Sequence, residues 1–445
     1  MSAEVHGASG ALTRARELMR QGALDAASAI VEQALARAPR DADALQLRGA
    51  IANLRRDYAT AIAASREAIA VRPQLTIAWL ELANAFARMD QCVAAADAYR
   101  EVLTREPSWP DAHFNLGLMQ KRLGDRMAAA RSFHAAWSRD PMLFDAAGYC
   151  VATLAECVRE GDRIAPQAPM AGNLEPVSVS VVICSIDDAK HDRAVALYRR
   201  LFGQMSGHLS GQMNGQMSAQ SGAQVRHEII SIRNARSLAE AYNWAVRKSV
   251  ADVIVLSHDD VDILADDFAA RLFHHLRSFD VLGVVGSTRA EGPTVGWSGH
   301  PNLRGWITHR LPNDAQWQVD LLDHRAVAGE IKVLDGVMLA ARREVLKAVP
   351  FDAGAFDGFH LGDIDWSLRA AQAGFRLGVA ADLGLVHASR GKYDATWQRY
   401  ADRFCVKHSL GTTPPAPSFF FGAKLDGPDQ VRAFFDLLRG LGASG

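Results

Sequence analysis

Proline recurs at a fixed interval of 34 residues near the start of the chain, at Pro39, Pro73, Pro107 and Pro141. Alanine recurs in the same phase, at Ala27, Ala61, Ala95 and Ala129. Each proline closes an alanine-rich stretch that favours helix. A period of this length is typical of repeated helix pairs, in which a small residue lets the two helices approach closely. The interval therefore predicts a stack of helix pairs that shares one continuous core.

Residues 8–160 resemble tetratricopeptide repeats, which have a 34-residue period. The characteristic positions of the third and fourth repeats are filled by Trp79, Leu82, Phe86, Leu116, Gly117, Phe133 and Ala136. The first repeat lacks the large aromatic residues and is predicted to be a cap. Four repeats exceed the minimum of about three that a solenoid needs. Stacked helix pairs form concave surfaces, so we expect this region to bind a protein partner.

Composition limits the classes of function that remain. A chain of 445 residues is expected to hold two or three domains. The formal net charge of −1 gives no general attraction to nucleic acid or to an anionic membrane. The five cysteines are scattered and form no CxxC pair, which indicates reduced thiols and a cytoplasmic protein. No apolar run reaches the roughly 18 residues needed to span a bilayer, so any membrane association is expected to be peripheral.

The chain changes character after the repeats. Prolines and glycines in residues 161–176 predict a linker. Strands predicted at 177–185, 227–232 and 252–256 alternate with helices predicted at 191–202 and 237–249, which indicates a multidomain chain with an α/β domain and a mostly parallel sheet over residues 177–410. Residues 203–224 are of low complexity and are expected to form a surface loop. Residues 411–445 are interpreted as a C-terminal extension that ends in an amphipathic helix.

Two acidic clusters lie about a hundred residues apart in the α/β region. Ser257-His-Asp-Asp-Val261 follows a β-branched run that is typical of a buried parallel strand, so its carboxylates are expected at the edge where open α/β sheets bind ligands. The second cluster includes Asp363 and opens a helix that ends at Gly374. Two separated acidic clusters on one framework suggest metal-assisted group transfer.

Four blocks of sequence resemble the family 2 glycosyltransferases, in particular a bacterial subgroup with His-x-Asp-Val in place of Asp-x-Asp. These blocks are residues 179–185, 237–243, 255–261 and 334–387. The resemblance implies the GT-A fold for residues 177–410. It also implies a nucleotide-sugar donor, a divalent cation (Mn²⁺ or Mg²⁺), and a protein or glycan acceptor with a free hydroxyl.

The resemblance also implies roles for individual residues. Asp363 matches the general base of an inverting transfer. Asp260, His258 and His387 match the positions that hold the metal ion, and His258 and Asp259 also lie where the nucleotide binds. The remaining nucleotide and sugar contacts are implied for Ser185, Asn234, Asn243, Asp335 and Gly336.

Departures from the family pattern leave alternatives open. Many relatives carry Glu-Asp where this chain reads Gly362-Asp363, and Arg233-Asn234 replaces an acidic residue common at the end of the second strand. A catalytically weak or inactive scaffold is therefore a second interpretation. A nucleotidyltransferase on a related sheet is a third, and the lack of a Gly-rich phosphate loop with a basic residue after the first strand counts against it. Asp365 is expected to stabilise its helix or pair with Arg369.

Some histidines and tryptophans could equally be structural. His387 could be a hydrogen-bonded core residue, and His274-His275 is expected on a solvated helix face. Trp297, Trp306 and Trp317 could stack on sugar rings or pack in the core.

Overall fold

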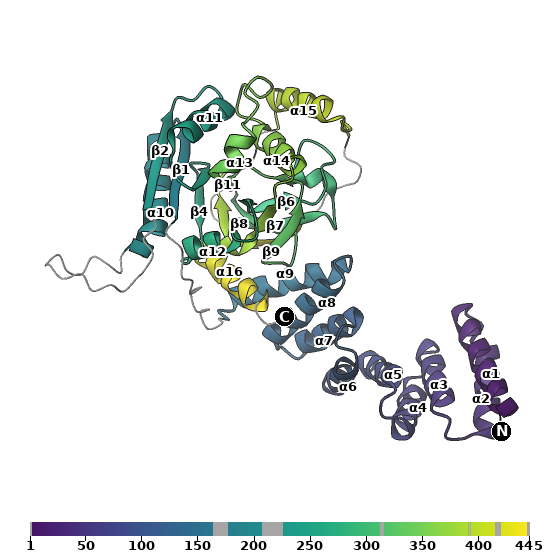
Figure 1. The fold of residues 1–445 in the computed structure, drawn as a ribbon. Helices are drawn as coiled ribbons and strands as arrows, with labels where there is room; N and C mark the ends of the chain where they lie inside the picture. Colours follow the sequence, from purple (N-terminus) through teal and green to yellow (C-terminus); the bar gives the residue numbers. More distant parts are fainter. Residues whose placement is uncertain are drawn as a thin grey trace, which may run out of the picture. The chain divides into compact units, whose positions relative to one another are not determined.

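The computed structural model describes residues 2–162, 177–206, 226–311, 316–389, 391, 393–413 and 420–442. Most of the predicted linker and of the predicted low-complexity loop lies outside these residues. The chain divides into two compact units, Met1–Cys157 and Val158–Gly445, which are described in turn (Figure 1).

The N-terminal unit is built of consecutive helices. They are α1 (Ser2–Arg20), α2 (Leu24–Arg37), α3 (Ala42–Leu54), α4 (Tyr58–Val71), α5 (Thr76–Arg88), α6 (Cys92–Arg105), α7 (Pro110–Arg122), α8 (Arg126–Arg139) and α9 (Phe144–Arg159). The four periodic prolines follow α2, α4, α6 and α8 by two residues each, and the four periodic alanines are fully buried. Within one pair, a methyl group on Gly117 of α7 would lie 2.7 Å from the Phe133 ring of α8. The predicted helix pairs and their small contact positions are thus confirmed.

The C-terminal unit holds two sheets. The first has the order β2-β1-β3-β11-β5-β12-β9, and the second has the order β10-β6-β7-β13-β4, with β8 paired to β7 and β14 paired to β8. Strands of the first sheet are β1 (Ser178–Ser185), β2 (Arg226–Arg233), β3 (Val253–Ser257), β5 (Val281–Gly283), β9 (Val327–Ile331), β11 (Met338–Arg342) and β12 (Leu377–Ala380). Strands of the second are β4 (Val261–Ile263), β6 (Val285–Ser287), β7 (Leu303–Arg310), β8 (Trp317–Leu321), β10 (Val333–Leu334), β13 (Leu385–His387) and β14 (Phe421–Leu425).

The first sheet is mixed rather than mostly parallel. β1 pairs in parallel with β2 and β3, because each is reached through a crossover helix, as the alternating pattern predicted. β11 returns antiparallel between β3 and β5, and β9 is antiparallel to β12. The predicted extension is also part of the fold, since β14 continues the second sheet through its antiparallel pairing with β8.

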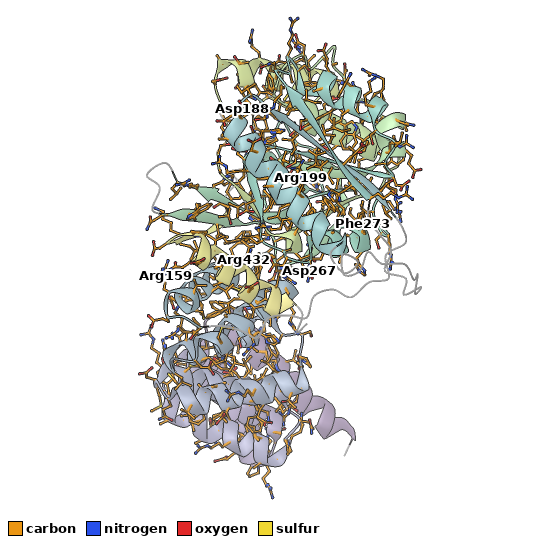
Figure 2. All side chains as sticks on the ribbon, turned by 90° about the vertical axis from the view of Figure 1, so that its left-hand side faces the viewer. Arg159, Asp188, Arg199, Asp267, Phe273 and Arg432 are labelled. Carbon is orange, nitrogen blue, oxygen red and sulfur yellow. The ribbon has the colours of Figure 1, made fainter. Side chains whose placement is uncertain are left out.

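Helices pack on the sheets from several sides. They are α10 (Asp188–Ser206), α11 (Leu238–Lys248), α12 (Phe268–His275), α13 (Arg343–Ala348), α14 (Gly362–Gln372), α15 (Ala395–His408) and α16 (Pro428–Gly442), with short 3₁₀ turns η1 (Val295–Ser298) and η2 (Ala381–Leu383). Along β3, Val253 and Val255 enter one hydrophobic cluster with α10 and α12, while Ile254 and Leu256 enter another with α11 and α13. Figure 2 shows Arg199 of α10 and Phe273 of α12 on adjacent helices. The two-residue period of the strand therefore feeds two cores, one on each face of the sheet.

Candidate active site

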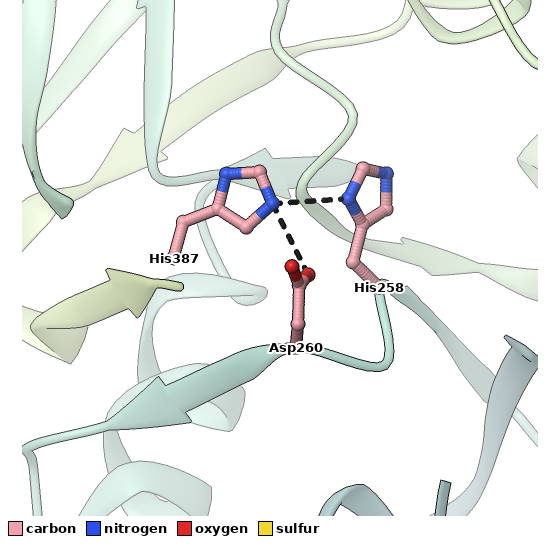
Figure 3. A group of neighbouring side chains, drawn as sticks. All are labelled: His258, Asp260 and His387. Atoms are coloured by element: carbon pink, nitrogen blue, oxygen red, sulfur yellow. Dashed lines mark hydrogen bonds and ion pairs between the residues drawn. The ribbon is translucent and has the colours of Figure 1, made fainter. Parts of the chain in front are cut away.

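Three metal-ligand side chains meet at the carboxyl end of β3. His258 Nδ1 lies 3.4 Å from His387 Nε2, and His387 Nε2 lies 3.2 Å from Asp260 Oδ1 (Figure 3). One ligand atom from each residue lies within 4.8 Å of the others. The structure thus brings together the three residues that the resemblance assigned to a metal ion.

Backbone pairing explains why these residues meet. His258 donates its backbone N–H to Val337 O, which extends the β3–β11 ladder by one residue. β4 begins directly after Asp260 and runs antiparallel to β13, so that Val261 lies opposite His387. Ala388 N–H donates to Asp260 O at 2.9 Å, which continues the same ladder. Strand register therefore holds Asp260 and His387 side by side, although 127 positions separate them in the chain.

The geometry and chemistry of the cluster fit a divalent cation. Two ligands at right angles, each about 2.1 Å from an ion, lie roughly 3 Å apart, close to the two separations observed here. Burial and the facing His387 ring lower the pKa of His258. Burial works to raise the pKa of Asp260, but the hydrogen bond and charge of His387 outweigh it and lower that pKa well below its usual range. Neutral imidazole and ionised carboxylate are the forms that bind metals, and a set with two imidazoles favours Mn²⁺ over Mg²⁺.

Asp363 sits in the first turn of α14, against the turn that joins β10 to β11. A methyl group added to Gly336 in that turn would lie 2.2 Å from Asp363 Oδ2, so the close approach requires glycine. The Asp335 side chain shapes the turn by accepting the Val337 N–H at 3.0 Å. Burial, followed by the nearby Asp335 carboxylate, raises the pKa of Asp363 to about 6, against hydrogen bonds from the backbone N–H groups of Ile364, Asp363 and Gly336.

The helix that carries Asp363 is anchored at several points. Ser367 Oγ accepts the backbone N–H of Leu334 at 3.0 Å, which ties α14 to β10. Asp365 is fully buried and accepts hydrogen bonds or ion pairs from Arg369, Lys407 and His408. The predicted Asp365–Arg369 pair is present, and two residues of α15 join it. These contacts hold the start of α14 in one position, as a catalytic carboxylate requires.

A cavity of about 1120 Å³ joins the candidate metal cluster to Asp363. His258, His387, Asp335, Gly336 and Asp363 all line it. Pockets for one small ligand usually measure about 300–1,000 Å³, so this cavity is slightly larger than a usual one-ligand pocket. Aromatic side chains also line it, among them Trp297, Phe359, Tyr393, Trp397 and Phe420.

The other predicted contact residues are placed differently. Ser185, at the end of β1, donates to Asp259 Oδ2 at 2.5 Å and so orders the loop after β3. Asn234 is exposed at the end of β2 with a φ of 54°. The Asn243 amide exchanges two hydrogen bonds with the Phe351 backbone, at 2.8 and 2.9 Å. Ser185, Asn234, Asp259 and Asn243 do not line the cavity. Both ends of the Asn243 amide instead hold α11 against the chain at Phe351.

Two further cavity residues were not predicted. His309 of β7 has its ring centroid 5.7 Å from that of His387, because the parallel β7–β13 pairing sets the two residues opposite each other. Lys190, in the first turn of α10, places its Nζ 3.9 Å from Asp260 Oδ2. The sequence carried a signal for Lys190, since it is the first basic residue after β1. For His309, the sequence indicated nothing beyond its position in a strand.

Two expectations about histidine and tryptophan are settled by burial. His275 was expected on a solvated face, but it is buried, with Nε2 3.0 Å from the Asp382 carboxylate. Trp306 is a core residue that donates to Ala381 O and stacks on Phe435 with centroids 5.4 Å apart. Trp297 does line the cavity, whereas Trp317 does not.

Comparison with known proteins divides the chain in the same way. Residues 216–408 match the sequence model described as a glycosyltransferase-like family. No curated protein matches the chain. The helices of the described residues include none that is long and apolar enough to cross a membrane.

Solved structures of repeat proteins are similar to about a third of the chain. MamA from Desulfovibrio magneticus RS-1 is 17% identical, with a TM-score of 0.32 over 35% of this chain and 86% of that one. A thermophilic TPR protein in Thermus thermophilus is 18% identical, with a TM-score of 0.30 over 35% of this chain and 84% of that one. The assignment of the repeats rests on the helix pairs and their period. The chain therefore combines N-terminal tetratricopeptide-type repeats with a glycosyltransferase-like domain at residues 216–408, and this match supports glycosyl transfer as the class of activity.

Proposed function

We propose that this protein is a metal-dependent, inverting glycosyltransferase that moves a sugar from a nucleotide-sugar donor to a hydroxyl of a protein or glycan acceptor. The observation that supports this most is that His258 and His387 line one cavity with Asp363, while Asp260 lies 3.2 Å from His387. A transferase of this kind needs a site that receives the leaving diphosphate and a base that receives the acceptor proton. Both kinds of group are present and face the same space.

His258, Asp260 and His387 would hold the divalent cation. When bound, the cation would neutralise charge on the diphosphate as it leaves. The three side chains would hold the cation at the carboxyl edge of the first sheet, where open α/β sheets bind their ligands. Ser185 supports this edge through its hydrogen bond to Asp259.

Asp363 would remove the proton from the acceptor hydroxyl. The acceptor oxygen then forms a bond to the anomeric carbon, while the bond from that carbon to the diphosphate breaks. A pKa near 6 suits this task, because the carboxylate is ionised at neutral pH and is still more basic than an ordinary aspartate. Gly336 and the anchored start of α14 would keep the carboxylate in place.

The aromatic side of the cavity would receive the acceptor. Phe359 and Tyr393 line the cavity and are 51% and 71% exposed, so their rings are accessible to an acceptor. The repeats would bind the acceptor or a partner protein on the concave surface that stacked helix pairs form. Docking the acceptor on the same chain would raise the local concentration of its hydroxyl near Asp363.

The first experiment is thermal unfolding of the full chain with UDP-, GDP- and dTDP-sugars, with and without Mn²⁺. A donor at about 100 times its Kd should stabilise the protein by about 2.7 kcal/mol. Asp260→Asn should remove the metal-dependent part of the shift. Asp262→Asn is the matched control, because Asp262 lies two residues away on β4 and is exposed.

The outcomes separate the two interpretations of the chain. A metal-dependent shift with one donor, lost in Asp260→Asn and kept in Asp262→Asn, followed by release of the nucleoside diphosphate, supports the enzyme. Binding without any turnover across donors and acceptors favours the inactive scaffold. Equal shifts with and without metal would contradict metal dependence.

A further inference from the structure

We infer that Lys190 binds the diphosphate of the donor and stabilises it as it leaves, beside the metal site rather than as part of it. This inference rests on the proposed function. It assigns a positioning and charge-neutralising role to a residue for which the family resemblance implied none.

The position of Lys190 is set by the start of α10. Its backbone N–H donates to the Asp187 side chain at 2.9 Å, which fixes the first turn of the helix. From there the side chain reaches the cavity and places Nζ 3.9 Å from Asp260 Oδ2. The other oxygen of Asp260 faces His387. Lys190 and His387 therefore approach different oxygens of the Asp260 carboxylate.

Lys190 differs in charge from the acidic residues of the cavity. Among the described residues that line it, Lys190 is the sole lysine or arginine, while Asp320, Asp335 and Asp363 are acidic. Asp260 adds a further carboxylate next to the lining residues. A nucleoside diphosphate brings at least two negative charges into this space. A single divalent cation would leave the site with excess negative charge, and Lys190 reduces that excess by one further charge.

The ammonium is placed near Asp260 without being tightly bound to it. A separation of 3.9 Å is an ion-pair distance and too long for a hydrogen bond, and the side chain is 39% exposed. Lysine has three N–H donors on a flexible stem, so it can move to a phosphate oxygen at little cost. Before the donor binds, the same charge lies beside Asp260 and opposes cation binding there. Lys190 should thus weaken metal binding to the free protein while strengthening diphosphate binding.

These opposite effects distinguish the inference from a purely structural role. In the transfer step, the bond between the anomeric carbon and the diphosphate oxygen breaks and its electron pair stays on that oxygen. The Lys190 ammonium would donate a hydrogen bond to the departing diphosphate at that point. It remains protonated, and the acceptor proton goes to Asp363.

The test uses the full chain with Lys190→Met, which removes the charge but keeps a similar length, and Lys190→Arg, which keeps the charge. Lys347→Met is the control, because Lys347 is exposed on α13 and does not line the cavity. Isothermal titration would measure Mn²⁺ binding first. Titrations of pyrophosphate, of UDP, GDP and dTDP, and of the matching nucleosides would follow in the presence of Mn²⁺.

We expect Lys190→Met to weaken binding of pyrophosphate and of the preferred nucleoside diphosphate by about tenfold or more, with nucleoside binding unchanged. Mn²⁺ binding to the free variant should be equal to or tighter than that of the wild type, and Lys190→Arg should retain most of the diphosphate affinity. Diphosphate binding within twofold of the wild type, or a loss of Mn²⁺ binding in Lys190→Met, would overturn the inference. If the wild type binds Mn²⁺ and nucleoside diphosphate and Lys190→Met binds both equally well, only the role of Lys190 is refuted. If the wild type binds neither Mn²⁺ nor nucleoside diphosphate, the proposed function is refuted as well.

Discussion

Replacing Gly336 with alanine should damage catalysis far more than stability. The added methyl group would lie 2.2 Å from Asp363 Oδ2, and 2.4 and 2.5 Å from its Cβ and Cγ. These atoms are not the free end of a long side chain, because Asp363 lies in the first turn of an anchored helix. The carboxylate, the turn or both must therefore move.

The size of the movement follows from the contact distances. Ordinary contact begins at 3.4 Å, so the Oδ2 separation must grow by about 1.2 Å, and a misplacement of about 1 Å can reduce a rate on the order of 100-fold. Overpacking of this kind usually costs about 1–3 kcal/mol. For the unit Val158–Gly445, about 2 kcal/mol corresponds to a fall in Tm of about 3 °C.

The assay is release of nucleoside diphosphate with the best donor, measured across pH, together with thermal unfolding. Gly362→Ala is the matched control, since it is next to Asp363, has no positive φ, and its added methyl group would meet Phe356 at an ordinary 3.7 Å. We expect the control to keep its activity and to be as stable as the wild type or slightly more so. In Gly336→Ala, weakening of the Gly336 hydrogen bond should raise the pKa of Asp363 further, which moves the activity midpoint above about pH 6.

One result would refute the reasoning. If Gly336→Ala and Gly362→Ala both turn over within twofold of the wild type, with the same pH midpoint, Asp363 is not held by this contact in the active state. Equal losses in both variants would point instead to a general sensitivity of the start of α14.

Three further predictions concern the base, the metal cluster and the repeats. Asp363→Asn should reduce turnover by about 10²–10⁴-fold. The raised pKa of Asp363 means that ionising this carboxyl in the folded protein costs stability as pH rises from 3.8 to about 6. The Tm of the Asp363→Asn variant at pH 7 should therefore not fall below that of the wild type, and a lower Tm would contradict the raised pKa. Asp260→Asn should weaken Mn²⁺ binding in a titration by more than about tenfold, since loss of even an outer-shell partner commonly costs 10- to 100-fold; unchanged affinity would remove it from the site. Gly117→Ala should destabilise the repeats by about 1–3 kcal/mol in denaturant unfolding, because the added methyl group meets the Phe133 ring. Gly148→Ala is the control and should be neutral or stabilising, because its methyl group meets nothing within 4 Å. Equal effects of the two substitutions would contradict the close packing of Gly117 on Phe133.

Local patterns in the sequence were enough to place most elements. The 34-residue period predicted the helix pairs, because each pair buries its small residues only against its neighbours. The β-branched run before Ser257 predicted β3, and the acidic run with Gly374 predicted both ends of α14. In each case the pattern and the element span the same few residues, so the physical cause is visible in the chain itself.

Tertiary structure decided how those elements meet. The antiparallel return of β11 turned a sheet predicted as mostly parallel into a mixed one, and no local pattern encodes the direction of a strand that arrives from 80 residues away. The resemblance gave roles to His258, Asp260 and His387, but only the β4–β13 register brings Asp260 and His387 to within 3.2 Å.

The same limit applies to single side chains. The amide side chain of Asn243 is of a type that often binds ligands, but its hydrogen-bond partner is the Phe351 backbone, more than a hundred positions away. By residue type, Lys190 is not distinguishable from an exposed lysine on a helix, but in the fold its ammonium lies near the carboxylate of Asp260. Hydrophobic period and residue type are local properties that sequence carries directly. The distance between two polar groups depends on long-range strand pairing, and it becomes defined only when the chain is folded.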